Sequence, residues 1–374
     1  MFGFWAALVI AAMALTDGVG ESIRYVQSRQ FTEPMFVFVV MVVAASRPVL
    51  VTIRRLVARV AAWLPARTEV AETWLCLALI PLVGSLVTEP AAMTLAALML
   101  APLVFREGMP EPLKYGALGM LFVNVSVGGT LTAYAAPPVL MVAETWGWTS
   151  LFMLQNFGWK AVVAVLVNAT VLTLRVRRHV VAGGSQGLRG AADPDDEIPT
   201  PPRVAAIHLV FLAAVVALAH YPVMFVGVFL MFLGYTQAYP RYQSPLILKE
   251  ALLVGFFLAG LVVLGGMQQW WLQPIVSGLE PTALFFGALG LTAITDNAAL
   301  TYLGSLIEGL SAEAKYMLVA GAVAGGGLTV IANAPNPAGV ALLRQGFNDG
   351  TIGAVGLLLG AALPTAVATA ALLL

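Results

Sequence analysis

The stretch LTAITDNAALTYL, residues 291–303, places Asp296 and Asn297 in the middle of a segment that is otherwise apolar enough for lipid. A similar stretch, SLVTEPAAMTLAAL, occupies residues 85–98, and Glu89 stands there 207 positions before Asp296. A charged side chain at the centre of a membrane helix costs about 2.5–3.5 kcal/mol on insertion scales. A carboxyl group repeated in such a setting therefore indicates function.

Composition sets the class of protein. The chain has 374 residues, of which 60% are hydrophobic and 10% are charged, whereas an ordinary soluble domain is about 25% charged. Its zero net charge gives no argument for nucleic acid as a partner. The single cysteine excludes an intrachain disulfide, and the three histidines have no metal-ligand spacing. The sequence predicts an all-α polytopic membrane protein without a cofactor.

Two apolar segments, 72–105 and 281–309, are too long for one span of about 20 residues. Each has polar residues near its centre, which fits a re-entrant hairpin that enters the membrane and turns back. Lipid cannot satisfy irregular backbone, so the two hairpin tips must be buried against protein or water.

Each hairpin is followed by a long segment that contains Gly, Asn and Pro, at 113–144 and at 314–343. Four of the residues at 128–132 match 325–329 at an offset of 197. Proline removes a backbone donor and disfavours helix in the residue before it. Both segments are therefore predicted to be transmembrane helices that are broken within the membrane.

The polar residues between the two halves indicate topology. Residues 176–202 form the long polar stretch of the chain, and most cations fall on its side of the membrane, which predicts a cytoplasmic linker. The two halves then have inverted topology. The predicted parts are an N-terminal helix and outer loop (1–33), a first inverted repeat (34–175), the linker (176–202), a connecting helix pair (203–245) and a second inverted repeat (246–374).

Inverted repeats with broken elements are typical of secondary transporters, which bind their substrate near the midplane. Carboxylate, amide and hydroxyl oxygens are hard ligands for a cation, and a carboxyl group away from water also holds a proton. The side chains and glycines expected at the ion and proton site are Thr88, Glu89, Asn124, Ser126, Gly128, Gly129, Thr130, Thr132, Lys160, Thr295, Asp296, Asn297, Asn333 and Asn336. The Na⁺ ligands predicted among them are Glu89, Asp296, Asn297 and Asn333.

Several of these residues also have simpler interpretations. Asp296 is suited to capping a helix, and Glu89 before Pro90 is suited to opening one. Either acid could pair with Lys160, which could instead extend to the outer interface. The glycines could serve close helix packing.

The order ITDNAALTYLGSL followed by GGGLTVIANAPNPAG resembles the ion transporter superfamily, which includes arsenite permeases, sodium-coupled dicarboxylate carriers and sodium/proton antiporters. The chain is most similar to a Na⁺/H⁺ antiporter family over residues 34–175 and 246–370. The resemblance implies a homodimer in a bacterial inner (cell) membrane, with a scaffold and a moving transport unit. It also implies ion binding at the hairpin tips and broken helices.

The predicted function is exchange of Na⁺, or another monovalent cation, for H⁺ through the two buried carboxyl groups. The alternative is an oxyanion or organic-acid permease coupled to Na⁺ or H⁺, with the half-helix N-termini facing the anion. The central segments contain no arginine, which disfavours an anion. A membrane-embedded enzyme is the third class, but the spans contain no Ser–His, HExxH or paired-cysteine motif.

Overall fold

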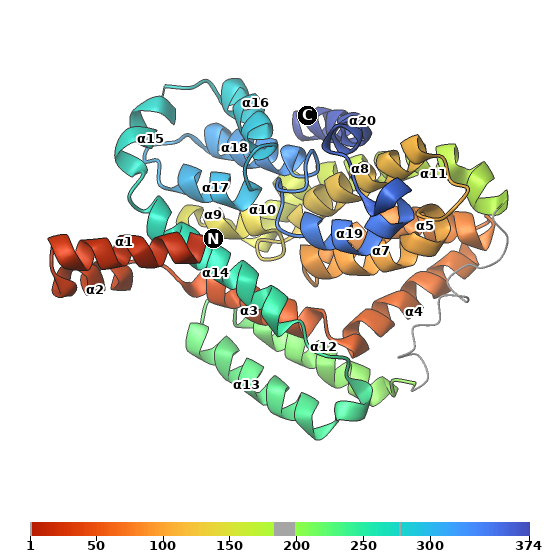
Figure 1. Ribbon diagram of the computed structural model, residues 1–374, viewed down its shortest axis with the longest axis horizontal. Coiled ribbons are helices and arrows are strands. Elements are labelled where there is room, and N and C mark those ends of the chain that lie inside the picture. Colours follow the sequence, from red (N-terminus) through yellow and green to blue (C-terminus); the bar gives the residue numbers. More distant parts are fainter. Residues whose placement is uncertain (1, 183–198, 277) are drawn as a thin grey trace.

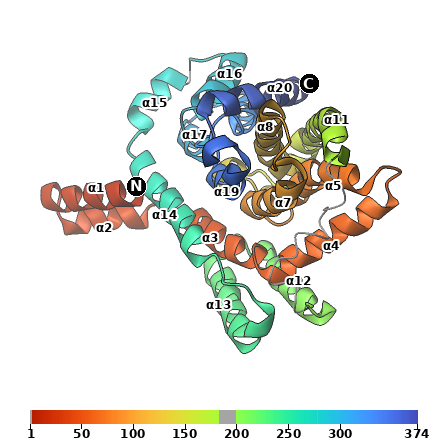
Figure 2. The ribbon, with the colours of Figure 1, turned by 45° about the vertical axis from the view of Figure 1, so that its right-hand side comes forward.

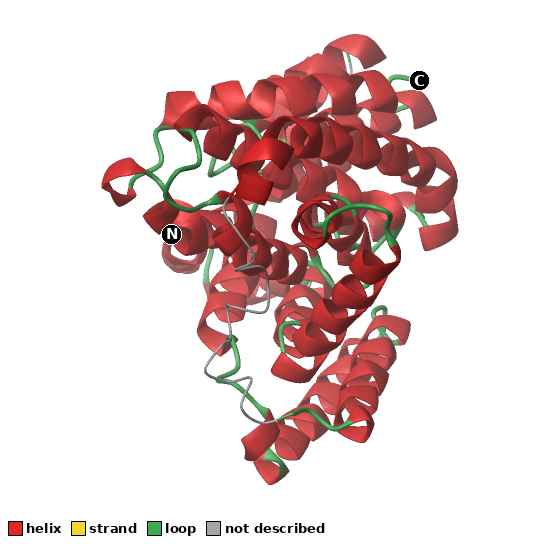
Figure 3. Ribbon diagram, turned by 90° about the vertical axis from the view of Figure 1, so that its right-hand side faces the viewer, coloured by secondary structure: helices red, strands yellow, loops and turns green. Residues whose placement is uncertain are grey.

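The computed structural model describes residues 2–182, 199–276 and 278–374, and these ranges contain helices but no strands (Figures 1 and 3). Three helical stretches there have the length and apolar composition of a membrane span: 150–181, α14 (Leu248–Gly265) and α20 (Ala354–Leu372). A fourth appears if the bent pair of α3 and α4 is counted as one. The chain is thus a helical integral membrane protein.

The first half is a succession of short helices. The segment predicted as a hairpin contains three helices, with a non-helical tip at residues 85–88, and the segment after it is interrupted at 129–136. The helices are α5 (Thr68–Leu77), α6 (Leu79–Gly84), α7 (Glu89–Val104), α8 (Glu111–Gly128) and α9 (Pro137–Trp146).

The second half repeats this pattern. Its hairpin segment is interrupted at residues 293–296, and the next helix is interrupted at 326–335. Its helices are α16 (Pro281–Thr292), α17 (Asn297–Ser305), α18 (Ala312–Gly325) and α19 (Asn336–Leu343).

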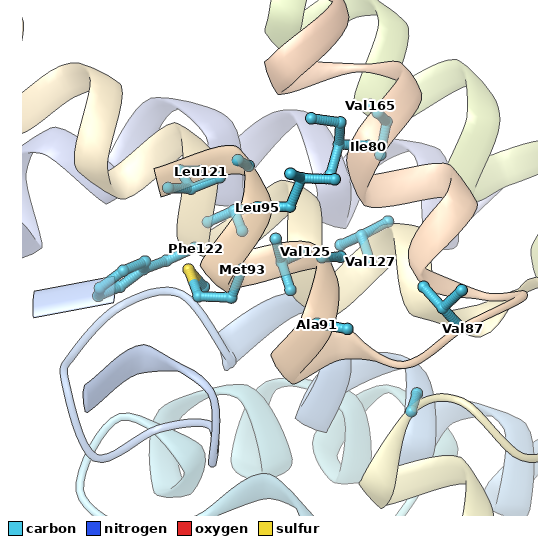
Figure 4. Packing of buried hydrophobic residues seen from close by; sticks show 14 of the residues in the cluster. Ile80, Val87, Ala91, Met93, Leu95, Leu121, Phe122, Val125, Val127 and Val165 are labelled. Carbon is cyan, nitrogen blue, oxygen red and sulfur yellow. The ribbon is translucent and has the colours of Figure 1, made fainter. Parts of the chain in front are cut away.

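Short helices from one half pack against short helices from the other. Helix α7 lies along α19, and α17 lies along α9 (Figure 1). Helix α8 packs on both α18 and α20. Figure 4 shows Met93 of α7 beside Phe122 of α8. Gly339 of α19 lies against both side chains, so the core here is shared by the two halves.

A second group of helices extends away from this core (Figure 2). Most of its members pack on one another, in the pairs α1–α14, α3–α14, α3–α13 and α12–α13, whereas α4 also packs on α5 and α15 contacts α17. The bounds are α1 (Phe2–Thr16), α2 (Val19–Gln27), α3 (Thr32–Ala44), α4 (Arg47–Trp63), α12 (Pro202–Ala217), α13 (Pro222–Ala238) and α15 (Gln269–Val276).

Two boundaries differ from the sequence prediction. The apolar segment that begins at residue 34 is not one straight helix, because α3 and α4 meet at a bend of 64° and Pro48 lies in the first turn of α4. The last helix of the first half begins as α10 (Ser150–Met153), passes through a π-helical turn and continues as α11 (Trp159–Ala182). Residues 176–182 are therefore helical and not linker, and 183–198 lie outside the described residues.

Candidate ion-binding site

Glu89 is the first residue of α7, after Thr88 as the N-cap, and its side chain is fully buried. Asn333 Nδ2, from the broken helix of the other half, donates a hydrogen bond of 2.7 Å to Glu89 Oε2. Glu89 Oε1 has no hydrogen-bond partner among the described residues. It lies against Gly129, where a Cβ atom would be 2.5 Å away. The lack of a side chain at this glycine leaves room for the carboxyl group.

Asp296 is the N-cap of α17 and is half-buried. Its Oδ1 accepts hydrogen bonds from the backbone N–H groups of Ala298, at 2.8 Å, and Ala299, at 3.1 Å. Thr295 beside it is exposed, and its hydroxyl donates to the carbonyl of Leu291 at 2.9 Å. The geometry of Asp296 is thus that of a capping residue.

Asn297 is the first residue of α17 and is fully buried. Its backbone N–H donates to the carbonyl of Ala332 at 3.0 Å. Neither Oδ1 nor Nδ2 of its side chain has a hydrogen-bond partner within the described ranges. Gly326 makes room for this amide, since a Cβ there would be 3.0 Å from Asn297 Nδ2.

The break in the second half supplies two further amides. Asn336 Nδ2 donates to the carbonyls of Gly326, at 2.8 Å, and Thr329, at 2.9 Å. The Oδ1 atoms of Asn333 and Asn336 are buried without a partner in the described part of the chain. Buried polar atoms are normally hydrogen-bonded. The Asn333 amide also bonds Glu89, so its free oxygen and Glu89 Oε1 are candidate ligands for an ion or water.

A glycine takes the same place in each half. Gly128 packs on the carbonyl of Pro81, and Gly325 packs on the carbonyl of Leu289; added Cβ atoms would lie 2.7 Å and 2.6 Å from these oxygens. In both halves the broken helix thus approaches the helix before the tip, α6 or α16, through a residue that has no side chain.

A threonine makes the same hydrogen bond in each half. Thr132 Oγ1 donates to the carbonyl of Ser85 at 2.7 Å, and Thr329 Oγ1 donates to that of Ala293 at 2.8 Å. The threonines, like the glycines, are 197 positions apart. The carbonyls that they contact are 208 positions apart, at 81 and 289 and at 85 and 293.

The offset of 208 changes which residues of the two tips are equivalent. The sequence match at 207 aligns Glu89 with Asp296, whereas an offset of 208 aligns Glu89 with Asn297 and Thr88 with Asp296. The helix boundaries agree with 208, because Thr88 and Asp296 are both N-caps and Glu89 and Asn297 both begin a helix. The contacts thus pair an acid with an amide.

Other predicted site residues make hydrogen bonds within the protein: those of Asn124 and Ser126 join different helices, and that of Thr130 is local. Asn124 Nδ2 donates to the carbonyl of Leu77 at 2.8 Å, and its Oδ1 accepts from Asn168 at 3.0 Å. Ser126 Oγ donates to the carbonyl of Val323 at 2.9 Å. Thr130 Oγ1 donates to the carbonyl of Val127 at 2.7 Å. Their roles in ion binding stay predictions.

Lys160 lies with aromatic and backbone groups and not with the carboxyl groups. Its Nζ donates to the hydroxyl of Tyr316 at 2.9 Å and to the carbonyl of Leu372 at 3.4 Å. It also lies 4.6 Å from the centre of the Tyr316 ring. In this arrangement Lys160 is not an ion-pair partner of Glu89 or Asp296.

Two polar residues of the site were not predicted. Ser85 Oγ donates to the carbonyl of Gly128 at 2.6 Å and accepts from the N–H of Leu131 at 3.0 Å. Thr329 Oγ1 donates to the carbonyl of Ala293, and the carbonyl of Thr329 accepts from Asn336 Nδ2. Ser85 lies in the repeated stretch 85–98 and Thr329 in the repeated stretch 325–329, so the sequence repeat could have predicted both.

The chain is a helical membrane protein with a buried carboxyl group among broken helices, which is typical of secondary transporters. The family described as "Putative Na+/H+ antiporter" matches residues 1–374, and the chain belongs to this family. The exchanged substrates of such a family are a cation and a proton. No curated protein matches the chain. The described residues contain no group of three or more His, Cys, Asp or Glu side chains that could hold a metal.

Proposed function

We propose that this protein exchanges Na⁺, or another monovalent cation, for H⁺ across a bacterial inner membrane, and that both ions use Glu89. The observation that carries the proposal is the fully buried carboxyl group of Glu89. One of its oxygens is bonded by an amide of the opposite half, and the other has no partner among the described residues.

The mechanism follows from competition for one group. Ionised Glu89, together with the oxygen of the Asn333 amide that bonds it, offers hard ligands to a cation that has lost its water. Protonated Glu89 has no charge to offer, so the cation leaves. A site that holds either ion but not both couples their movements in opposite directions.

The proposed architecture is a pair of inverted repeats with re-entrant hairpins, as in the ion transporter superfamily. The matched glycine and threonine contacts support it, as does the pairing of α7 with α19 and of α17 with α9. The proposal includes a cytoplasmic linker between the halves and a homodimer.

One observation favours an anion permease as the second candidate. Helices α7, α17 and α19 all begin at the site, and helix N-termini attract anions. Against it, no described contact brings an Arg or Lys side chain to Glu89, Asn333 or Asn336. Glu89 itself would repel an anion unless a coupling cation or proton neutralised it.

Purified protein in liposomes with a trapped pH dye tests the proposal. With an acidic interior, external Na⁺ should alkalinise the lumen in wild type but not in Glu89→Gln, because glutamine keeps the shape of the side chain but cannot release a proton. No response of wild type to Na⁺, Li⁺ or K⁺ would reject exchange, and uptake of labelled oxyanions and organic acids would then test the second candidate.

A further inference from the structure

We infer that the cation is coordinated between Glu89 and Asn297, and that Asp296 caps α17 without coordinating the ion. This inference rests on the proposed exchange function and specifies its site. The sequence pattern alone suggests two equivalent acids, whereas the structure pairs one acid with one amide.

The equivalence of Glu89 and Asn297 is the first argument. Each is the first residue of the helix that follows its tip, and each is fully buried. Each also lies against the second glycine of a repeated glycine pair, Gly129 in one half and Gly326 in the other. In a pseudo-symmetric arrangement, residues with the same place in each half face the same central site.

The second argument is that both residues meet one short piece of backbone. The N–H of Asn297 donates to the carbonyl of Ala332, and the side chain of the next residue, Asn333, donates to Glu89. Residues 332 and 333 therefore hold the starts of α7 and α17 next to each other.

The state of the Asn297 side chain is the third argument. Both of its polar atoms are buried without a partner among the described residues. An amide in that state loses its hydrogen bonds to water and gains nothing in return. Coordination of a cation by Oδ1 would restore a partner, and the Oδ1 atoms of Asn333 and Asn336 lack partners in the same way.

The role of Asp296 is the fourth argument. Its Oδ1 already accepts two backbone hydrogen bonds, from the N–H groups of Ala298 and Ala299. Its counterpart Thr88 caps α7 in the same manner, accepting from the N–H of Ala91 at 3.3 Å. Since threonine has no charge, capping at this place does not require a carboxylate.

The test measures the melting temperature of detergent-purified protein as Na⁺ replaces choline at constant ionic strength and alkaline pH. An ion that binds the folded state raises the melting temperature, and the rise grows with the logarithm of the ion concentration divided by its dissociation constant. Wild type should show a Na⁺-dependent rise. Asn297→Ala and Glu89→Gln should each weaken apparent Na⁺ binding more than about tenfold. Asn297→Asp, which keeps an oxygen at that place, should retain binding.

Asp296→Thr copies the cap of the first half and should keep apparent Na⁺ affinity within about tenfold of wild type. The control is Asn168→Ala, which removes a different buried amide: it should lower the melting temperature without changing the response to Na⁺. Loss of the response in Asp296→Thr, or its retention in Asn297→Ala, would overturn the inference while the exchange function stands. If wild type itself does not respond to Na⁺, Li⁺ or K⁺, both fail. If Asn297→Ala does not fold, Asn297→Asp and Asp296→Thr still decide.

Discussion

At the scale of single residues, the site depends on space as much as on polarity. Gly129 allows the carboxyl group of Glu89 to lie against the backbone of the broken helix, and its own backbone angles are ordinary helical ones. The glycine is thus required for close approach and not for an unusual conformation. The sequence placed Glu89 and Gly129 in the same predicted site, but it could not show which of their atoms touch.

Gly129→Ala should impair exchange without unfolding the protein, because the new methyl group would meet Glu89 Oε1 at 2.5 Å. We expect the initial rate of Na⁺-driven alkalinisation in liposomes to fall at least about tenfold, the equivalent of about 1.4 kcal/mol. The matched control is Gly287→Ala in α16, where no atom lies within 4 Å of the added carbon. Equal rates for the two variants would contradict a spatial role for Gly129.

At the scale of elements, helix breaks are stabilised by side chains from other helices. Pro81 has no N–H, so the carbonyl of Leu77 loses its helical partner, and Asn124 Nδ2 donates to it instead. Asn168 in turn donates to Asn124 Oδ1. The sequence showed the proline, but the partner lies 47 positions away from Leu77 and is found only when α8 packs on α6.

Asn168→Ala should reduce the free energy of unfolding by about 1–3 kcal/mol, because it leaves the buried Oδ1 of Asn124 without its donor. It also removes the hydrogen bond of 3.3 Å to the carbonyl of Pro364. Unfolding in a denaturing detergent would measure the change. Thr170→Ala on the same helix removes an exposed hydrogen bond from Trp74 and should cost less. Similar losses in both variants would argue against the buried network.

The elements also show where sequence reasoning stops. Hydrophobic length and central polar residues predicted that the segments 72–105, 113–144, 281–309 and 314–343 are interrupted, and helix breaks lie within all four. Re-entrance of the first and third stays a prediction. The bend between α3 and α4 and the change from an offset of 207 to 208 did not follow from them. The first depends on tertiary packing, and the second on which carbonyl each glycine and threonine contacts.

At the scale of the whole molecule, the orientation of the halves decides whether they are inverted repeats. Glu107 lies just before α8, and Glu313 lies in the first turn of α18; both are exposed. Inverted halves place these two residues on opposite sides of the membrane. The single cysteine, Cys76, is fully buried and so does not compete for surface labels.

Glu107→Cys and Glu313→Cys should therefore react with a membrane-impermeant maleimide from opposite sides. We expect Glu313→Cys to be labelled in intact cells, and Glu107→Cys to be labelled only in inside-out vesicles. Arg177→Cys, at the exposed end of α11, should behave as Glu107→Cys does. Labelling of Glu107→Cys and Glu313→Cys from one side would mean that the repeats run in parallel.

The bond from Ser126 to the carbonyl of Val323 joins positions that are 197 apart, which is the spacing of the repeated glycines. Each residue thus touches its own counterpart, and this happens only on an axis that relates the halves. In one model of alternating access, the two halves exchange conformations so that the site opens to the other side of the membrane. Residues that contact the opposite half away from the axis would then have to change partners. Under the proposed inverted repeats, Ser126 and Val323 would remain neighbours in both states. The crossing of α8 and α18 would then be the part of the molecule that stays in place while the site changes its access.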